Sequence, residues 1–424
     1  MSPEIILNTT KGYCGPCDQI VPAQIVVHND AVWLRRNCPV HGVTEARQTR
    51  HVDHYRRLEL LLPPLRPNFS LDYEIAAAPH VRGVFVDLTG RCNLHCPNCL
   101  ADAGGASGDE ANLEEFMAAL ANLLPRRPVI VLSGGEPTLR ADLAQWIARL
   151  TSAGYELKLL SNGIKLADPD YCRELVAAGL RWSLIQFDSF RDEGLLPLRG
   201  RPGLADVRRR AVENMSSLGV NICLNCMLDS RHNLDEVGEV LRFAFRTPGV
   251  RHVQLMPARC LGRGEAASEE NELEDVDIIE AVAAQTGGSI VYSDWLAFFR
   301  LMSSVYRLTG SPYFAPRRCF LPLPLVGDAE RFFPITRWDS FLRQPGNLWP
   351  LIKMAARGGK AESADWSERS LVMVIESFRE PASIDVGDAS RCSRYYYRHG
   401  RLQQSCLYNV IDRPRMRAAR VCSR

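Results

Sequence analysis

The stretch GVFVDLTGRCNLHCPNC, residues 83–99, decides the fold of this chain. Its apolar run over 83–88 predicts a buried strand, because strands of a parallel sheet are covered on both faces. Three cysteines, Cys92, Cys96 and Cys99, follow in the next loop. Thiolates at spacings of four and three residues can turn toward one centre, and three ligands on a 4Fe-4S cluster leave one iron open for chemistry. Three buried structural cysteines or a zinc loop are the alternatives.

Five further apolar runs follow this strand, each separated from the next by a helical pattern. The expected strands are 83–88, 129–133, 156–161, 182–188, 220–228 and 252–257, and the expected helices are 112–124, 143–154, 171–180, 204–219 and 234–245. Repeated βα units imply parallel strands joined by right-handed crossovers. Six units are two short of a closed eight-fold barrel. We therefore expect an α/β fold with a partial (β/α)6 TIM-like barrel over residues 80–263, and a doubly wound sheet is the alternative.

The cysteine loop and its strand resemble the radical SAM enzymes, whose signature is C-x3-C-x2-C after the first strand. The resemblance covers residues 83 to about 260. It implies that S-adenosylmethionine (SAM) chelates the open iron of a 4Fe-4S cluster held by Cys92, Cys96 and Cys99. One electron, from a reductase such as flavodoxin or ferredoxin, then cleaves SAM to methionine and a 5'-deoxyadenosyl radical. That radical abstracts hydrogen from a substrate.

A second element of the resemblance is SGGEP, residues 133–137, at the end of the second strand. It matches the segment that receives the amino group of SAM in this family. Two glycines let the backbone approach a ligand, and a carboxylate faces an ammonium. The positions that the family uses for the SAM carboxylate and ribose follow the third and fourth strands. The implied SAM-binding residues are Gly134, Gly135, Glu136, Pro137, Ser161, Asn162 and Asp188.

The first 60 residues contain two metal-ligand pairs, Cys14 with Cys17 and Cys38 with His41. A hairpin is expected between the pairs, over residues 19–36, with Asn29-Asp30 at its turn. Pairs two residues apart can each bind one tetrahedral ion, as in zinc ribbons or rubredoxin-like folds. Four ligands close the site, so we expect a structural Zn(II) or a mononuclear iron. Prolines in LLPPLRPN, 61–68, mark the end of this module.

Residues 264–424 form the expected third module, with a helix expected over residues 273–285. The order of a C-P-x-H-G knuckle, a radical SAM core, QTGGSI and the segment RCSRYYYRHGRLQQSCLYN resembles the tetraether lipid synthase and pterin methylase branch. That branch implies an auxiliary iron-sulfur cluster, which maps onto Cys319, Cys392 and Cys406, with Cys422 as a fourth ligand. A second cysteine near Cys319, expected from relatives, is missing here. Fewer clusters, or a cluster with fewer ligands, follow from that departure.

Composition excludes several classes. The 424 residues are 46% hydrophobic and 24% charged, which is typical of a globular protein. The net charge of +2 gives no general attraction for nucleic acid. No apolar stretch is long enough to span a membrane and no export signal is evident, so we expect a cytoplasmic protein.

The function expected from the resemblance is C–H activation with C–C bond formation, by alkylation or methyl transfer, on a lipid, a pterin or another small molecule. A peptide-modifying maturase is one alternative, and a non-catalytic iron-sulfur scaffold or redox sensor is the other.

Overall fold

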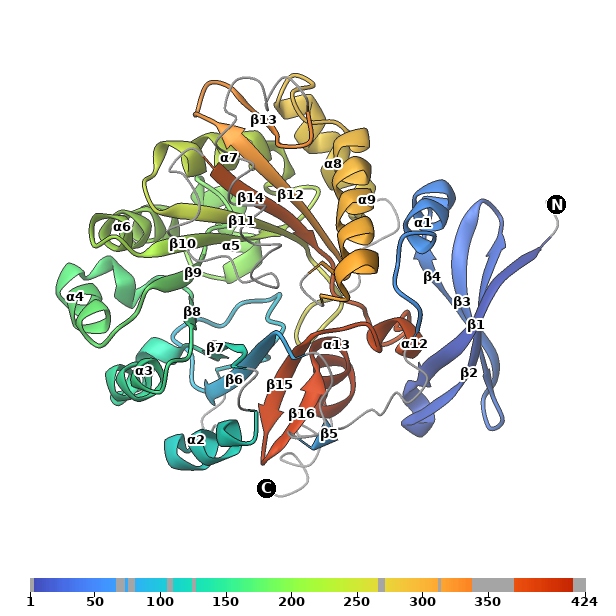
Figure 1. Ribbon diagram of the computed structural model, residues 1–424, viewed down its shortest axis with the longest axis horizontal. Coiled ribbons are helices and arrows are strands. Elements are labelled where there is room, and N and C mark those ends of the chain that lie inside the picture. Colours follow the sequence, from blue (N-terminus) through green and yellow to red (C-terminus); the bar gives the residue numbers. More distant parts are fainter. Residues whose placement is uncertain are drawn as a thin grey trace.

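The computed structural model describes residues 4–65, 73–74 (backbone only), 81–104, 110–123, 127–265, 271–311, 314–337 and 370–414. All six predicted strands are present as parallel neighbours in chain order. They are β6 (Gly83–Thr89), β7 (Val129–Gly134), β8 (Leu157–Ser161), β9 (Trp182–Gln186), β10 (Asn221–Leu228) and β11 (Val250–Pro257). The order never reverses, whereas a doubly wound sheet requires a reversal. The sheet curves around a centre as a partial barrel (Figure 1), so the doubly wound alternative is wrong.

Helices cover the outer face of the barrel (Figure 1). The five predicted ones are α2 (Leu113–Ala121), α3 (Leu143–Ser152), α4 (Pro169–Ala177), α6 (Leu204–Ser217) and α7 (Val237–Arg246). A sixth, α5 (Asp192–Arg199), was not predicted. Short 3-10 turns lie at Gly15–Cys17, Pro137–Leu139, Lys165–Ala167 and Leu234–Glu236. The apolar stripe of each barrel helix packs on the strands; α3, for example, buries Trp146, Ile147 and Leu150 completely.

Strands from the last third of the chain extend both edges of the barrel sheet instead of forming a separate body. The additional strands are β12 (Phe320–Gly327), β13 (Phe332–Pro334), β14 (Ser370–Glu376), β15 (Arg394–Arg398) and β16 (Arg401–Gln404), with β5 (Tyr73–Glu74) at the end. On one side β14 pairs in parallel with β11, and on the other β15 pairs in parallel with β6. Because an open barrel leaves two unpaired strand edges, these additions satisfy them.

In the described residues of the last third, the helices are α8 (Asp275–Gln285), α9 (Tyr292–Thr309), α12 (Val386–Ala389) and α13 (Ser405–Leu407), followed by a π-helical turn at Tyr408–Asp412. The helix predicted over 273–285 is confirmed as α8, whereas α9 was not predicted. Both long helices pack on the main core through buried side chains such as Ile279 and Phe299. They flank the barrel on the side that faces the amino-terminal module (Figure 1).

The amino-terminal module is a four-stranded antiparallel sheet. Its strands are β1 (Ile5–Cys14), β2 (Gln19–His28), β3 (Ala31–Cys38) and β4 (Gly42–Thr49), and α1 (Val52–Glu59) follows. The predicted hairpin is confirmed, because Asn29 and Asp30 turn the chain with φ of 48° and 53° between β2 and β3. Asparagine and aspartate tolerate this left-handed region better than most residues.

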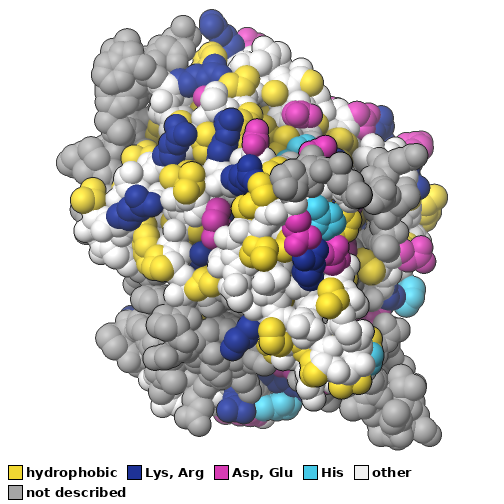
Figure 2. Space-filling view, turned by 90° about the vertical axis from the view of Figure 1, so that its right-hand side faces the viewer, with side chains coloured by type: hydrophobic (Ala, Val, Ile, Leu, Met, Phe, Trp, Pro, Cys, Tyr) yellow, Lys and Arg dark blue, Asp and Glu magenta, His cyan; other side chains and the backbone are white. Residues whose placement is uncertain are grey.

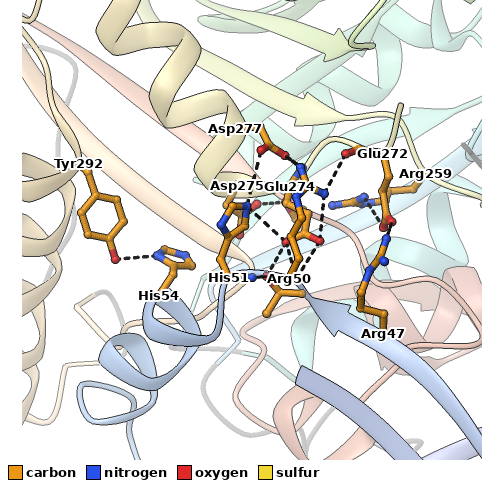
Figure 3. A network of polar contacts seen from close by, with 12 residues as sticks. Arg47, Arg50, His51, His54, Arg259, Glu272, Glu274, Asp275, Asp277 and Tyr292 are labelled. Carbon is orange, nitrogen blue, oxygen red and sulfur yellow. Dashed lines mark hydrogen bonds and ion pairs between the residues drawn. The ribbon is translucent and has the colours of Figure 1, made fainter. Parts of the chain in front are cut away.

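A polar network joins this sheet to the barrel (Figure 3). Arg47 of β4 contacts Glu272 at 2.8 Å, and Glu272 lies 3.6 Å from Arg259. Arg50 pairs with Asp277 and lies 3.4 Å from Glu274. Because Glu272, Glu274 and Asp277 all lie at the start of α8 or just before it, the network ties the end of β4 to that helix.

None of the helices in the described ranges is long and apolar enough to cross a membrane. On the face shown in Figure 2, Lys and Arg side chains are interspersed with acidic ones. That mixture agrees with the near-neutral net charge. The cytoplasmic location stays a prediction.

Candidate active site

The three predicted cluster ligands lie in the loop between β6 and α2 and border one cavity. Cys92, Cys96 and Cys99 all line this cavity, whose volume is about 700 Å³ and which fills the interior of the barrel. Backbone N–H groups point at two of the sulfurs, from Leu94 to Cys92 at 3.4 Å and from Ala103 to Cys99 at 3.4 Å. Such donors stabilise the negative charge of sulfur in iron-sulfur sites. The three thiols and their surroundings therefore fit the ligand set that would hold a 4Fe-4S cluster beside the cavity.

The two glycines of SGGEP allow the β7 loop to pack directly on the cysteine loop. A Cβ on Gly135 would lie 2.2 Å from the carbonyl oxygen of Arg91, and one on Gly134 would lie 2.5 Å from that of Thr89. Backbone bonds hold this approach, from Gly135 N to Thr89 O at 2.7 Å and from Glu136 N to Arg91 O at 2.8 Å. The glycines thus bring the candidate SAM loop and the cluster loop together, and both border the cavity.

Glu136 is buried between the β7 and β8 loops and serves as their common acceptor. Its carboxylate accepts hydrogen bonds from Thr138 N (3.2 Å), Thr138 Oγ1 (2.6 Å), Ser161 Oγ (2.9 Å) and Asn162 N (2.8 Å). Burial raises the pKa of Glu136, and these donors oppose that shift. The predicted pairing with a SAM ammonium stays a prediction. These contacts show that Glu136 links the β7 loop to the β8 loop by hydrogen bonds.

Asn162 connects the β8 loop to the cluster loop. Its side-chain Nδ2 donates to Asn93 Oδ1 at 2.7 Å and lies 3.9 Å from Cys92 Sγ. Ser161 is buried and donates to Glu136, as described above, while its Oγ accepts from Gly163 N at 3.1 Å. Both residues border the cavity. The structure therefore places Ser161 and Asn162 on the cavity wall, with Asn162 nearer to the cluster ligands, and their role in binding SAM stays a prediction.

Asp188 lies behind the cavity wall rather than in it. Its side chain has no exposed surface, and its carboxylate binds Arg199 at 2.7 and 2.8 Å, Arg208 at 2.8 Å and the N–H of Met227 at 2.9 Å. Burial alone would raise the pKa of Asp188, but the two guanidinium groups outweigh it and lower the pKa. With its acceptors occupied, Asp188 positions Arg199, which does line the cavity.

Sequence reasoning missed Arg199. It ends α5, the helix that was not predicted, and lies beside the Cys96 thiol. A buried cation next to a cluster ligand offsets the charge of thiolate sulfur. The only signal in the sequence was an arginine eleven residues after an aspartate, which is too common a pattern to interpret.

The amino-terminal metal site has the predicted ligands. The ligand atoms of Cys14, Cys17, Cys38 and His41 all lie within 4.8 Å of one another. His41 Nδ1 is 3.5 Å from both Cys14 Sγ and Cys38 Sγ, and Cys17 Sγ is 3.6 Å from Cys38 Sγ. The backbone N–H of His41 donates to Cys38, and this bond helps to lower the pKa of Cys38 to about 6. Three thiols and an imidazole at this spacing fit one tetrahedral ion.

The three carboxy-terminal cysteines lie within electrostatic range of one another, near the end of β14 and the start of β15. Cys319 precedes β12, Cys392 precedes β15, and Cys406 lies in α13. Burial raises the pKa of Cys319 to about 12, and Cys392 contributes electrostatically; burial likewise raises the pKa of Cys406, with contributions from Cys319 and Cys392. The predicted fourth ligand, Cys422, lies outside the described residues.

Cationic and aromatic side chains surround this junction. Glu376, the last residue of β14, pairs with Arg394, the first residue of β15. The ring of Phe320 lies between Arg317 and Arg394, whose guanidinium carbons are 4.7 and 4.6 Å from the ring centroid. Arg317, Phe320 and Arg394 also line the cavity. The cysteine triplet therefore adjoins the barrel interior.

Comparison with known proteins identifies the core. Residues 86–244 match the family described as the radical SAM superfamily. The barrel core over residues 86–244 is a radical SAM domain. Residues 6–48 match the HMPTM N-terminal zinc ribbon domain, so the amino-terminal module is a zinc ribbon. The resemblance drawn from the cysteine loop is thereby confirmed.

Individual relatives share only part of their length with this chain. It is 29% identical to 7,8-dihydro-6-hydroxymethylpterin dimethyltransferase of Methanocaldococcus jannaschii over 306 residues, 68% of this chain and 60% of the relative. It is 30% identical to AdoMet-dependent heme synthase of Methanosarcina barkeri over 191 residues, 43% of this chain and 52% of the relative. The chain thus spans between half and two thirds of these curated relatives. The crystal structure of Streptococcus suis SuiB bound to S-adenosylmethionine superposes with a TM-score of 0.39 at 11% identity, covering 49% of this chain and 47% of that one.

Proposed function

We propose that this radical SAM enzyme activates a C–H bond of a small polar heterocycle of the pterin type and forms a C–C bond there, by methyl transfer or another alkylation. The observation that carries the proposal is the cavity itself. Its lining holds the three cluster thiols and the glycine loop, and most of the remaining surface is apolar but includes several arginines and carboxamides. Apolar walls with a few placed polar groups suit a flat heterocycle, whose ring packs on the apolar surface while the arginines and carboxamides bind its polar atoms.

The 4Fe-4S cluster and SAM, when bound, supply one-electron cleavage of SAM and a 5'-deoxyadenosyl radical. The residues of this chain bind and orient the cluster and SAM, and they shield the radical from water. Cys92, Cys96 and Cys99 would hold the cluster, and the loop of Gly134 and Gly135 would lie against SAM. The strands around the cavity exclude water, which prevents quenching of a radical. A one-electron reductase such as flavodoxin or ferredoxin would supply the electron.

Two observations favour a pterin among the heterocycles. The zinc ribbon match and the M. jannaschii relative, a pterin dimethyltransferase by name, together span both the ribbon and the barrel. The heme synthase relative shares only 43% of this chain. We propose Zn(II) for the ribbon site, because four closed ligands of this kind are typical of structural zinc.

We further propose that Cys319, Cys392 and Cys406 hold an auxiliary iron-sulfur cluster. Three partly buried thiols within electrostatic range, with Arg317 and Arg379 nearby to offset their negative charge, fit such a group. The cluster would lie at the junction of the two sheet edges and next to the substrate cavity.

The deciding experiment measures iron, sulfide and 5'-deoxyadenosine in anaerobically purified protein. Two 4Fe-4S clusters give about eight iron and eight sulfide, and replacing Cys92, Cys96 and Cys99 by alanine removes about four of each. Cys260→Ala, in a loop outside both cysteine sets, is the matched control and keeps the full content. The wild type with dithionite and SAM forms 5'-deoxyadenosine. A full cluster content without this product would instead support the iron-sulfur scaffold or redox sensor. Loss of all sulfide in the triple variant would show that the protein holds no auxiliary cluster.

A further inference from the structure

Three carboxamide side chains lie side by side across the middle of the cavity. Gln186 of β9, Asn225 of β10 and Gln254 of β11 all line it. Asn225 pairs in register with Gln186 on one side and with Gln254 on the other. Register partners in adjacent strands lie about 4.8 Å apart, so the row spans about 10 Å. We call these three residues the amide row.

The row lies beside the candidate SAM residues at the end of β8. Ile185 pairs in register with Ser161, so Gln186 and Asn162, the residues that follow them in the chain, lie at the same height in the barrel. The side chain of Asn162 reaches the cluster loop at Asn93 and Cys92. A molecule that rests on the amide row therefore faces the cluster end of the cavity.

Neighbouring charges fix the direction of the two outer amides. Buried Arg208 donates to Gln186 Oε1 at 3.2 Å, which leaves the Nε2 of Gln186 as a donor. On the other side Gln254 Nε2 donates to Glu376, which leaves the Oε1 of Gln254 as an acceptor. Arg394 in turn holds Glu376. The row thus has a donor at one end and an acceptor at the other.

Asn225, at the centre of the row, shows that the arrangement serves a ligand. It is only 9% exposed, and its Oδ1 has no hydrogen-bond partner among the described residues. A buried polar atom without a partner destabilises the folded state, so the fold alone gives no reason for an asparagine here. Because the Asn225 side chain borders the cavity, rotation of its amide toward a polar ligand there would supply the missing partner.

We infer that the amide row determines the specificity of the substrate site. It recognises a cyclic amide in the substrate by hydrogen bonds to the ring carbonyl and to the neighbouring N–H or amino group. The donor of Gln186 takes a ring carbonyl, and the acceptor of Gln254 takes an adjacent ring N–H or amino group. This inference rests on the proposed function, because the pyrimidinone ring of a pterin has such an edge. It adds which residues read the ring and in which direction.

The test compares two fluorescent ligands that differ at this edge. In 6-hydroxymethylpterin the ring carbonyl accepts a hydrogen bond, and in 2,4-diamino-6-hydroxymethylpteridine an amino group replaces that carbonyl and donates. Anaerobically reconstituted full-length protein with SAM is titrated with each ligand, and Kd is measured by fluorescence. The wild type binds the pterin about tenfold or more tightly than the diamino compound. In the diamino complex the Nε2 of Gln186 faces the amino group of the ligand, and because both groups are donors neither forms a hydrogen bond.

Three variants carry the argument. Gln186→Glu replaces the donor by an acceptor and shifts the preference at least tenfold toward the diamino compound. Asn225→Leu weakens pterin binding about tenfold or more without lowering the Tm of the ligand-free protein, since the amide that it removes has an unpaired oxygen. Gln145→Glu, on the exposed side of α3, is the matched control and changes neither ligand's Kd.

The outcomes separate the inference from the proposed function. Equal binding of both ligands by the wild type, or unchanged Kd values in Gln186→Glu and Asn225→Leu, overturns the role of the amide row and leaves the pterin substrate standing. A lowered Tm of ligand-free Asn225→Leu would make Asn225 a structural residue and also overturns it. Binding of neither pteridine by the wild type overturns the proposed substrate class together with the inference.

Discussion

Replacing Glu136 by glutamine tests whether this buried carboxylate braces the SAM loop. In the wild type one carboxylate oxygen accepts from Thr138 and Ser161, and the other accepts from the backbone N–H of Asn162 at 2.8 Å. A glutamine keeps one acceptor oxygen and places an NH2 group at the other position. If the oxygen faces Thr138 and Ser161, the NH2 meets the N–H of Asn162, and that buried donor loses its partner.

The magnitude follows from this one lost bond. A buried donor left without a partner costs about 1–3 kcal/mol, which is about 5- to 150-fold in affinity at 1.4 kcal/mol per tenfold. Because Asn162 also contacts the cluster loop, the displacement weakens SAM binding while the cluster thiols stay in place. Equilibrium dialysis of labelled SAM with anaerobically reconstituted Glu136→Gln measures the loss, and its iron content stays at the wild-type value.

Ser161→Ala separates the brace from a direct charge contact. It removes one hydrogen bond to Glu136 and leaves the carboxylate charge, so a brace predicts weaker SAM binding here too, by about fivefold or more. Glu174→Gln, an exposed carboxylate on α4, is the matched control and leaves SAM binding unchanged. Wild-type affinity in Glu136→Gln would refute the brace. Weaker SAM binding by Glu136→Gln together with wild-type SAM affinity in Ser161→Ala would show that Glu136 pairs directly with the SAM ammonium.

Three further predictions concern the metal site, the buried ion pairs and the dependence on pH. Cys38→Ser removes one of four converging ligands, so zinc measured by emission spectroscopy falls to near zero while iron is unchanged; retained zinc would contradict the site. Asp188→Ala leaves two buried guanidinium groups unpaired and destabilises the barrel by about 3–5 kcal/mol, seen as a lower urea midpoint, whereas Asp206→Ala, largely exposed on α6, has no such effect. Burial lowers the pKa of His54 to about 4, so its contribution to stability is complete above the unfolded pKa of about 6.5 and is lost as the pH falls toward 4. His54→Phe therefore loses less stability than the wild type between pH 7 and pH 4.5, by about 3 kcal/mol at most, and equal losses in urea titrations would refute this.

The barrel strands and the metal-ligand sets were predictable because their signals are local. A parallel strand buried on both faces is an unbroken apolar run, and the cluster triad and each pair of the zinc ribbon lie within a few residues of the chain. The segment Phe320–Gly327 became a strand against its local signal, since Pro322 and Pro324 argue against one. Its pairing with β14 comes from a segment more than 40 residues later, which no local pattern shows.

The site roles that sequence reasoning missed depend on tertiary contacts. An aspartate after a strand fits a ligand of SAM as well as it fits a partner of two arginines. Only the packing of α5 and α6 against β9 decides between them, by placing Arg199 and Arg208 on Asp188. The direction of the amide row is a similar case, because Arg208 and Glu376 reach it from different parts of the chain.

The extension of the barrel sheet at both edges and the proximity of the carboxy-terminal cysteines have one cause. A six-stranded sheet leaves its first and last strands unpaired, and the chain satisfies them with β15 beside β6 and β14 beside β11. The ion pair of Glu376 and Arg394 then joins the two added strands, and Cys319 and Cys392 stand next to their ends. Glu376 also holds Gln254 of the amide row. A change in the charge of the cysteine triplet therefore acts, through Arg394 and Glu376, on the amide row. We expect that loss of an auxiliary cluster in Cys392→Ala weakens the binding of 6-hydroxymethylpterin. An unchanged Kd would show that the triplet and the substrate site are independent.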